Sequence, residues 1–256
     1  MSPLPLFGRT GHPTAVWNPT NISGCVLWLR SDLGITMDGS NRVGTWADQS
    51  ENENNATQDT DAIKFLWIDD QLDGYPILRS DGVDDSMFIG GIASALSGEN
   101  KPFTIYIVGK IASDVGADCS WFGMQNTGTS TPLYWGPRSV DSYCARRSDA
   151  GSFLSVVGTE MTKGSWKIFR VQFGSDGLIN LWENATQLIT NGNLNSAGTV
   201  TFDIALLCNY GQNVSYDYGS MKADFASVII YDSALSVADD SLVKGYLQNK
   251  YPSLTT

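Results

Sequence analysis

Histidine and cysteine are scarce in this chain, and their scarcity removes whole classes of enzyme. The 256 residues include one histidine, His12, in an N-terminal stretch that contains several prolines and glycines. A histidine-rich metal centre is therefore excluded, and a Ser-His-Asp or Cys-His arrangement would need a residue from this stretch. None of the cysteines Cys25, Cys119, Cys144 and Cys208 forms a Cys-x-x-Cys pair, so zinc and redox motifs are absent. We expect free thiols, although two disulfides stay formally open.

Positive charge is also in short supply. The chain has 16 Lys and Arg residues against 27 Asp and Glu, which gives a net charge of −11 at pH 7. Because a phosphate backbone or an anionic membrane would repel such a chain at long range, we predict neither nucleic acid nor a membrane as a partner. Only five of the acids are Glu, while Asp, Asn and Gly abound. Those residues are typical of turns, so the composition favours an all-β fold.

Long apolar runs are missing as well. None approaches the roughly 18 residues that a membrane span requires, and residues 1–20 lack the basic start and apolar core of a secretory signal. We therefore expect an unanchored protein that would leave a cell by lysis or in a particle. Residues 1–20 are interpreted as an N-terminal arm and residues 21–256 as one domain, since no linker or internal repeat divides them.

Short alternating segments dominate the rest of the chain. Strands are predicted where apolar residues alternate or run together, at 25–30, 103–110, 166–173, 178–182, 200–207 and 225–231. Several of these segments are apolar on both faces, as expected for the inner strands of two packed sheets. The Asp176-Gly177 pair between two of them is the strongest hairpin signal.

One helix is predicted, near the C-terminus. Ser236 is its N-cap and Pro252 its stop, and its apolar face holds Leu242, Val243, Tyr246 and Leu247. Many short strands with Gly and Asn turns, followed by one helix, indicate an antiparallel β-sandwich or jelly roll.

Motifs at both ends of the domain are recognisable. The first segment, 23–33, contains Trp28-Leu-Arg-Ser-Asp32 and is followed by residues 43–50, with Trp46-Ala-Asp-Gln-Ser50, and by residues 54–57. The middle segment, 74–85, ends in Asp81-Gly-Val-Asp-Asp85, and residues 226–236 and 245–251 close the domain. Together they resemble the bacterial and phage laminin-G-like branch of the concanavalin A-like lectin/glucanase superfamily. The resemblance implies a concanavalin A-like jelly roll whose concave face and rim loops bind carbohydrate in many relatives.

The Asp81–Asp85 segment is a candidate cation site. It places Asp81, Asp84 and Asp85 around a glycine turn, and Ca²⁺ takes several hard oxygen ligands at close range. Members of the superfamily that it resembles often carry structural calcium, so we predict a structural Ca²⁺ held by these three carboxylates. The alternative is a solvated turn in which each Asp caps its own backbone.

Two stretches outside the motifs mix aromatic rings with polar groups. A sugar presents an apolar C–H face and a rim of hydroxyls, so its site needs flat rings together with amide, carboxylate or guanidinium groups. From residues 134–147 and 209–218 we predict a carbohydrate-binding site made of Trp135, Arg138, Tyr143, Arg146, Tyr210, Asn213 and Tyr216. The alternative is that these stretches belong to a protein interface or to the core.

Catalysis is not expected. The glucanases of the superfamily carry Glu-x-Asp-x-x-Glu on one strand and its alginate lyases use Gln-x-His, and neither pattern occurs here. We predict a non-catalytic, lectin-like module that binds a cell-surface or extracellular glycan, at the virion surface of a phage or outside a cell. The alternative is a virion structural or decoration protein that contacts other virion proteins through its arm. Self-association into a homo-oligomer stays open, and a glycan-degrading enzyme is the least favoured reading.

Overall fold

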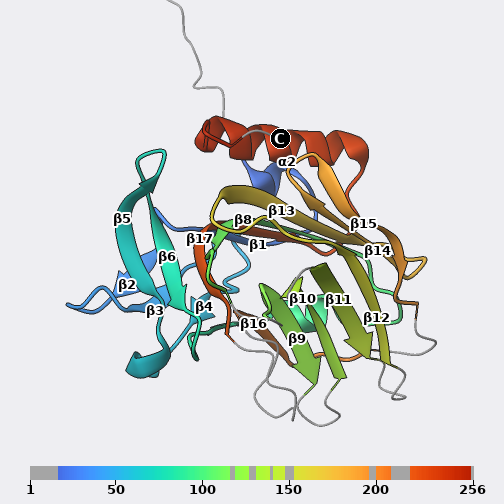
Figure 1. Ribbon diagram of the computed structural model, residues 1–256, viewed down its shortest axis with the longest axis horizontal. Helices are drawn as coiled ribbons and strands as arrows, with labels where there is room; N and C mark the ends of the chain where they lie inside the picture. The colour runs from blue at the N-terminus through green and yellow to red at the C-terminus, as the bar shows by residue number, and fades with distance from the viewer. Residues whose placement is uncertain are drawn as a thin grey trace, which may run out of the picture.

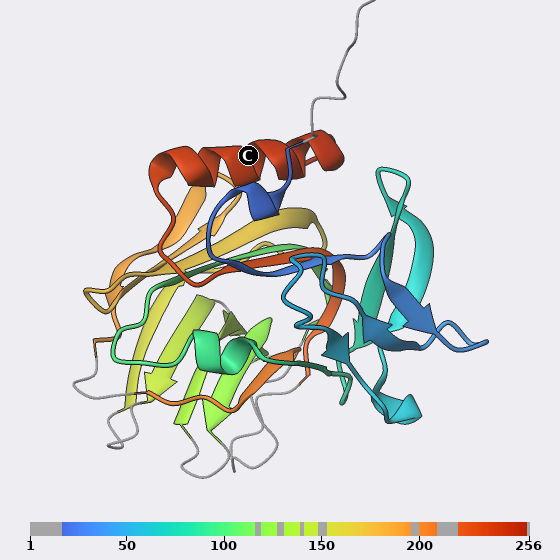
Figure 2. The same ribbon diagram turned by 180° about the vertical axis from the view of Figure 1, so that it is seen from behind.

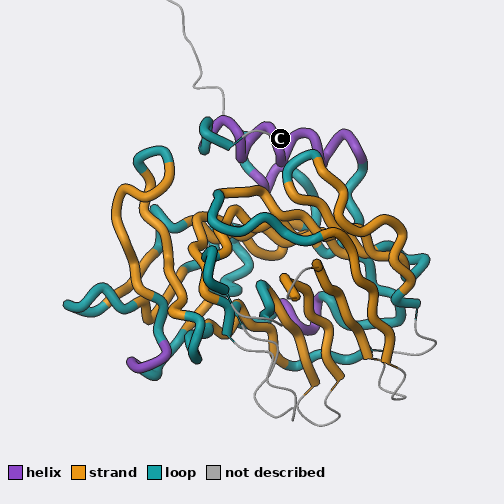
Figure 3. The backbone as a smooth tube through the Cα atoms, viewed as in Figure 1, coloured by secondary structure: helices purple, strands orange, loops and turns teal. Residues whose placement is uncertain are grey.

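The computed structural model describes residues 17–115, 119–126, 131–138, 141–147, 153–195, 200–208 and 220–254. Two β-sheets face each other, and helix α2 (Val237–Lys250) lies across the outer surface of one of them (Figures 1 and 2). The backbone trace shows strands in both layers and α2 above them (Figure 3). The predicted all-β sandwich with a C-terminal helix is therefore confirmed.

The sheet beneath α2 has eight strands among the described residues. Their order is β15-β14-β13-β8-β17-β6-β5, and β1 pairs with the end of β17 that β6 leaves open. The strands are β1 (Cys25–Arg30), β5 (Leu66–Leu72), β6 (Tyr75–Asp81), β8 (Phe103–Ile111), β13 (Trp166–Phe173), β14 (Leu178–Glu183), β15 (Thr186–Asn193) and β17 (Lys222–Tyr231). A shift of register between Phe225 and Ser227 separates the two parts of β17.

The opposite sheet has nine strands among the described residues, in the order β12-β11-β10-β9-β16-β7-β4-β3-β2. They are β2 (Ile35–Met37), β3 (Val43–Trp46), β4 (Ala56–Thr57), β7 (Met87–Ile89), β9 (Phe122–Asn126), β10 (Thr131–Arg138), β11 (Asp141–Arg147), β12 (Phe153–Thr159) and β16 (Ile204–Leu207). The remaining elements are α1 (Ile92–Ala95) and the 3₁₀ turns η1 (Pro19–Asn21) and η2 (Asp61–Ile63).

The main core lies between the two sheets. Trp121, next to β9, contacts Phe169 and Phe225 of the opposite sheet, with ring centroids 5.0 Å apart in both pairs. A Cβ atom at Gly109 would lie 2.5 Å from the Trp121 ring, so β8 carries glycine where that ring presses on its backbone. Large aromatic residues thus tie the layers together, and each contributes a large apolar surface to the core.

A second apolar cluster lies between α2 and the sheet. Ile229 and Tyr231 of β17 point away from the main core and pack under Val243, Leu247 and Tyr251. The sheet is therefore buried on both faces along its central strands β8 and β17, which are buried at nearly every position. Because α2 is held by this cluster, its outward face forms a fixed wall at the molecular surface.

Local sequence signals located most of these elements. β1 and β13 have the predicted bounds, Gly177 adopts a φ of +76° in the predicted hairpin, and Ser236 Oγ caps α2 by accepting a hydrogen bond from the backbone N–H of Asp239 at 3.1 Å. The strand predicted at 200–207 is shorter and covers Ile204–Leu207. The four cysteines are free and buried in the structure.

Two further findings concern membrane spans and the predicted arm. In the part of the chain that the structure describes, no helix has the length and apolar character needed to cross a membrane. Residues 17–20, which the sequence analysis assigned to the arm, lie on the domain: Tyr231 Oη donates a hydrogen bond of 3.0 Å to the carbonyl oxygen of Pro19. The arm up to residue 16 lies outside the described residues.

Candidate functional site

Two of the predicted sugar-binding residues, Trp135 and Tyr143, are buried. Trp135 on β10 is 0% exposed and belongs to the main core, so its ring offers no face to a ligand. Tyr143 on β11 is 6% exposed, and its ring pairs with that of Tyr134 at 5.6 Å between centroids. Since both rings are covered, the prediction of Trp135 and Tyr143 as stacking residues is wrong for this structure.

The other members of the predicted sugar site are placed only in part. Arg138 is the last residue of β10, and Arg146 on β11 pairs in register with Leu133. Tyr210, Asn213 and Tyr216 lie outside the described residues. The predicted site therefore stays a prediction for these five positions.

The structure brings the three predicted calcium ligands together. Carboxylate oxygens of Asp81, Asp84 and Asp85 lie within 4.8 Å of one another. Asp85 Oδ2 accepts the backbone N–H of Asp81 at 2.8 Å, and Asp81 Oδ1 accepts that of Val83 at 2.7 Å, so two of the carboxylates also stabilise their own turn. Burial, with the nearby Asp81 and Asp84 carboxylates, raises the pKa of Asp85 to about 6. This arrangement of oxygens suits a hard cation, and it is equally consistent with the solvated-turn alternative.

A thermal-denaturation experiment separates the two interpretations of this turn. If Ca²⁺ binds here, 5 mM CaCl₂ is expected to raise the melting temperature by a few degrees, because a ligand that binds only the folded state stabilises it. Excess EDTA should reverse the increase, and Asp84→Asn should abolish it. An unchanged melting temperature in calcium would support the solvated turn.

A groove lies where α2 faces the β5–β6 hairpin. Figures 1 and 2 show the C-terminal half of α2 beside the tip of this hairpin and close to the first described residues. The groove has a volume of about 610 Å³, within the range of roughly 300–1,000 Å³ that is typical of small-molecule sites. Its walls come from α2, from β1, from the hairpin and from Trp17.

Three half-buried aromatic rings line this groove. Trp17 lies 5.9 Å from Tyr246 of α2, measured between ring centroids. Tyr75, at the start of β6, packs edge-on against Tyr251 at 5.6 Å. Tyr246 also packs edge-on against Trp28 at 5.8 Å. The rings are therefore held by neighbours on one side while they line open space on the other.

Polar groups stand among these rings. Asn249, exposed on α2, has an amide that bonds to no described residue, and Ser241 lies two turns earlier on the same helix. Arg30 of β1 and Lys250 of α2 complete the lining with two positive charges. Gly245 lies between Ser241 and Asn249, and a Cβ atom there would meet nothing within 4 Å. The groove thus combines flat rings, hydroxyl and amide groups, and open space.

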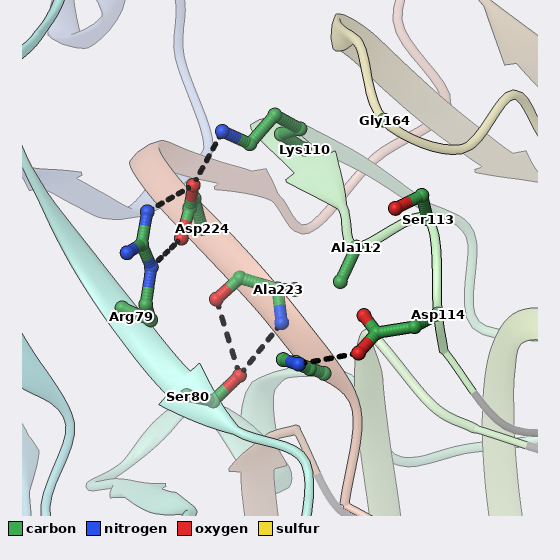
Figure 4. A pocket seen from close by; sticks show the side chains of 10 residues that line it. Arg79, Ser80, Lys110, Ala112, Ser113, Asp114, Gly164, Ala223 and Asp224 are labelled. Carbon is green, nitrogen blue, oxygen red and sulfur yellow. Dashed lines mark hydrogen bonds and ion pairs between the residues drawn. The ribbon is translucent and has the colours of Figure 1, made fainter.

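A second hollow, of about 290 Å³, lies beside the ends of β6, β8 and β17 (Figure 4). Its centre is the carboxylate of Asp224, which is buried. Arg79 holds it with two hydrogen bonds, from Nε at 2.6 Å and Nη2 at 2.9 Å, and Lys110 Nζ lies 2.9 Å from Oδ2. At the rim, Lys222 Nζ lies 2.6 Å from Asp114 Oδ2.

The charges in this second hollow are already matched to one another. Asp224 is satisfied by two cations from β6 and β8, so the cluster fastens three neighbouring strands together. The hydrogen bond with Asp224 raises the pKa of Arg79 above its ordinary value, and this effect exceeds the opposing effect of partial burial. No aromatic ring is among the described residues that line it. The groove beside α2 is therefore the better candidate site.

No family model and no curated protein sequence matches the chain. Solved structures do resemble it. The binding domain of Paraclostridial Mosquitocidal Protein 1 superposes with a TM-score of 0.62 at 13% identity, over 91% of this chain and 53% of that one. The ligand-binding domain of botulinum neurotoxin serotype D, solved with N-acetylneuraminic acid, gives a TM-score of 0.61 at 11% identity, over 87% and 51%.

A third structure is matched over nearly its whole length. Domain 4 of AbnA, an extracellular arabinanase from Geobacillus stearothermophilus solved with arabinotriose, gives a TM-score of 0.58 at 12% identity, over 86% of this chain and 97% of that one. The chain spans about half the length of the two toxin structures. At these identities the similarity shows the sandwich fold alone, and the laminin-G-like branch stays a prediction.

Proposed function

We propose that this protein is a non-catalytic carbohydrate-binding module that holds a glycan in the groove between α2 and the β5–β6 hairpin. One observation carries the proposal: Trp17, Tyr75 and Tyr246 come from three distant parts of the chain and line one groove together. Aromatic rings in a polar groove are suited to a sugar, whose C–H face stacks on a ring while its hydroxyls bind polar groups. Asn249 and Ser241 supply such groups on α2.

The similar structures support a glycan as the partner. The neurotoxin domain was solved with N-acetylneuraminic acid and the arabinanase domain with arabinotriose, so the fold holds sugars in both. This chain matches the arabinanase domain over 97% of that domain's length. Because fold alone does not fix function, the aromatic groove carries the argument and the fold adds to it.

The groove chemistry also supports a role without catalysis. Glycoside hydrolysis normally uses two carboxylates on either side of the bond that is broken. Among the described residues that line the groove there is neither Asp nor Glu. A bound sugar would therefore meet rings, amides and cations, which are groups for recognition.

A glycan partner places the domain outside a cell or on the surface of a phage particle. The sequence resemblance, whose branch includes phage proteins, supports the particle setting. In that setting the arm before Trp17 would contact neighbouring virion proteins. Deleting residues 1–16 should then abolish incorporation into particles while glycan binding is kept.

A glycan array followed by variants of Gly245 tests the proposed site. Gly245→Leu is expected to weaken binding of any glycan found on the array by tenfold or more, because the new side chain would extend into the groove. Its free energy of unfolding should rise by up to about 1 kcal/mol, since glycine is a poor residue inside a helix. Binding measured by calorimetry and stability measured by urea denaturation would therefore move in opposite directions.

Gly245→Ala is the matched control. The added methyl group meets nothing within 4 Å, so glycan affinity should stay within about twofold while the helix gains stability. Full affinity of the leucine variant would show that the sugar binds elsewhere. An array without a selective hit would count against the proposed function and favour the assembly role.

A further inference from the structure

The groove is positively charged although the chain as a whole is strongly acidic. The net charge is −11, yet the described residues lining the groove include Arg30 and Lys250 and no acid. The polar hollow of Figure 4 has both signs in its wall. A positive groove on such a chain sets up a local field that attracts an anionic ligand once it is close.

The two cations share a single carboxylate behind the groove. Asp32 Oδ2 accepts from Arg30 Nη2 at 2.7 Å and from Lys250 Nζ at 2.9 Å, and Asp32 Oδ1 accepts from Arg30 Nε at 3.2 Å. Arg30 Nη1 donates to no described residue. One negative charge therefore holds two positive charges in place, and the cluster keeps a surplus of one.

Lys250 is the more deeply buried of the two cations. Its side chain is 7% exposed, and its Nζ lies 3.7 Å from the centre of the Tyr75 ring. Burial lowers the pKa of Lys250 below its ordinary value, and the hydrogen bond to Asp32 only partly opposes that effect. A second anion in the groove would favour the charged form of this ammonium group, as an opposite charge close by does.

We infer that the groove selects glycans that carry a carboxylate, as uronic and sialic acids do. The carboxylate binds between Arg30 Nη1 and Lys250 Nζ, while the sugar ring lies on the aromatic wall of Trp17 and Tyr246. Asp32 is a positioning residue, because it orients both cations without lining the groove. The inference rests on the proposed function and adds the class of sugar.

Matched pairs of sugars test this selectivity. 3′-Sialyllactose is compared with lactose, and an oligosaccharide ending in glucuronic acid with its glucose counterpart, by calorimetry at low salt. We expect the acidic member of at least one pair to bind about tenfold more tightly, because one charge-assisted hydrogen bond raises affinity by about that factor. The ratio of the two affinities should fall as salt is added.

Variants of the cluster should change this ratio in opposite directions. Arg30→Gln and Lys250→Gln are expected to reduce it towards one. Asp32→Asn should increase it, because the amide oxygen still accepts a hydrogen bond that helps to hold the cations but no longer neutralises their charge. An increase cannot result from partial unfolding. Lys64→Gln, which removes a charge paired with Asp61 elsewhere, should leave the ratio unchanged.

The outcomes separate the inference from the proposed function. If acidic and neutral members bind equally, or if only neutral sugars on the array bind, the inference is wrong and the carbohydrate-binding function stands. If a sulfated counterpart binds as tightly as the carboxylated sugar, the groove responds to charge alone and the assignment of a carboxylate is overturned. If no glycan binds at all, the proposed function itself fails.

Discussion

Trp135→Ala is expected to lower the free energy of unfolding by about 3–5 kcal/mol, the usual cost of truncating a fully buried tryptophan. The ring is 0% exposed and packs in the main core between the sheets. Its removal leaves a cavity in the main core, which the surrounding strands cannot close without moving. Urea denaturation followed by circular dichroism measures the loss, and glycan affinity of the remaining folded protein should be unchanged.

Trp135→Phe is the matched control for the cavity. Trp135 Nε1 donates no hydrogen bond to a described residue, so the smaller ring gives up volume but no polar contact. We expect it to cost about 1–2 kcal/mol, well below the alanine variant. A Trp135→Ala protein that melts normally and no longer binds glycans would mean that the ring lies at the surface.

The error about Trp135 has a local cause. Residues 134–138 contain Gly136 and Pro137, which are typical of loops, and this composition concealed a strand. β10 pairs with both β9 and β11, and its alternation directs Trp135 inward. Gly136 is needed because a Cβ atom there would lie 2.2 Å from the carbonyl oxygen of Cys119. That contact joins residues distant in sequence, so no local pattern could reveal it.

Elements defined by nearby residues were predicted well because their signals are local. The alternation of β13 and the turn at Gly177 are complete within about a dozen residues, and Ser236 caps α2 through a neighbour three positions away. Such signals do not depend on which strands become partners. The fold class therefore followed from the sequence, whereas the depth of individual side chains did not.

The groove escaped prediction because its parts are far apart in the chain. Trp17 fell in the presumed arm, and Tyr75 lies in β6, which was not among the predicted strands. One signal was present on α2, where four apolar residues were assigned to one face. Val243 and Leu247 are buried, but Leu242 is 48% exposed and Tyr246 lines the groove. When the apolar face of a helix is wider than its contact with the core requires, the extra apolar residues indicate a surface used for binding.

Asp240→Ala is expected to cost about 3–5 kcal/mol, because it breaks the buried network that fastens α2 to the sheet. The carboxylate, 8% exposed, accepts from Tyr106 Oη at 2.6 Å, lies 2.9 Å from Lys244 Nζ and forms an ion pair with Arg170. Its loss leaves the guanidinium of Arg170 buried without a carboxylate. Because Tyr246 and Gly245 depend on the position of α2, glycan binding should weaken as well.

The pH dependence of the stability lost in Asp240→Ala shows whether the ionised carboxylate is responsible for it. Burial opposes ionisation of Asp240, but hydrogen bonds from Arg170, Tyr106 and Lys244 outweigh burial and lower its pKa below the ordinary value. A lowered pKa stabilises the folded state above the pKa of the unfolded chain, about 3.9, and that stabilisation is lost as the pH falls through the folded value. The difference in unfolding free energy between wild type and Asp240→Ala should therefore be constant from pH 5 to 8 and shrink below about pH 4.

Asp239→Ala is the adjacent control, since Asp239 is half-buried and exchanges hydrogen bonds with the cap residue Ser236. It should cost no more than about 1 kcal/mol. Equal costs at the two positions, or a difference that persists unchanged to pH 2, would mean that the ion pairs of Asp240 do not hold α2. The apolar cluster under Val243 and Leu247 would then fix the groove wall alone, and Asp240→Ala should leave glycan affinity intact.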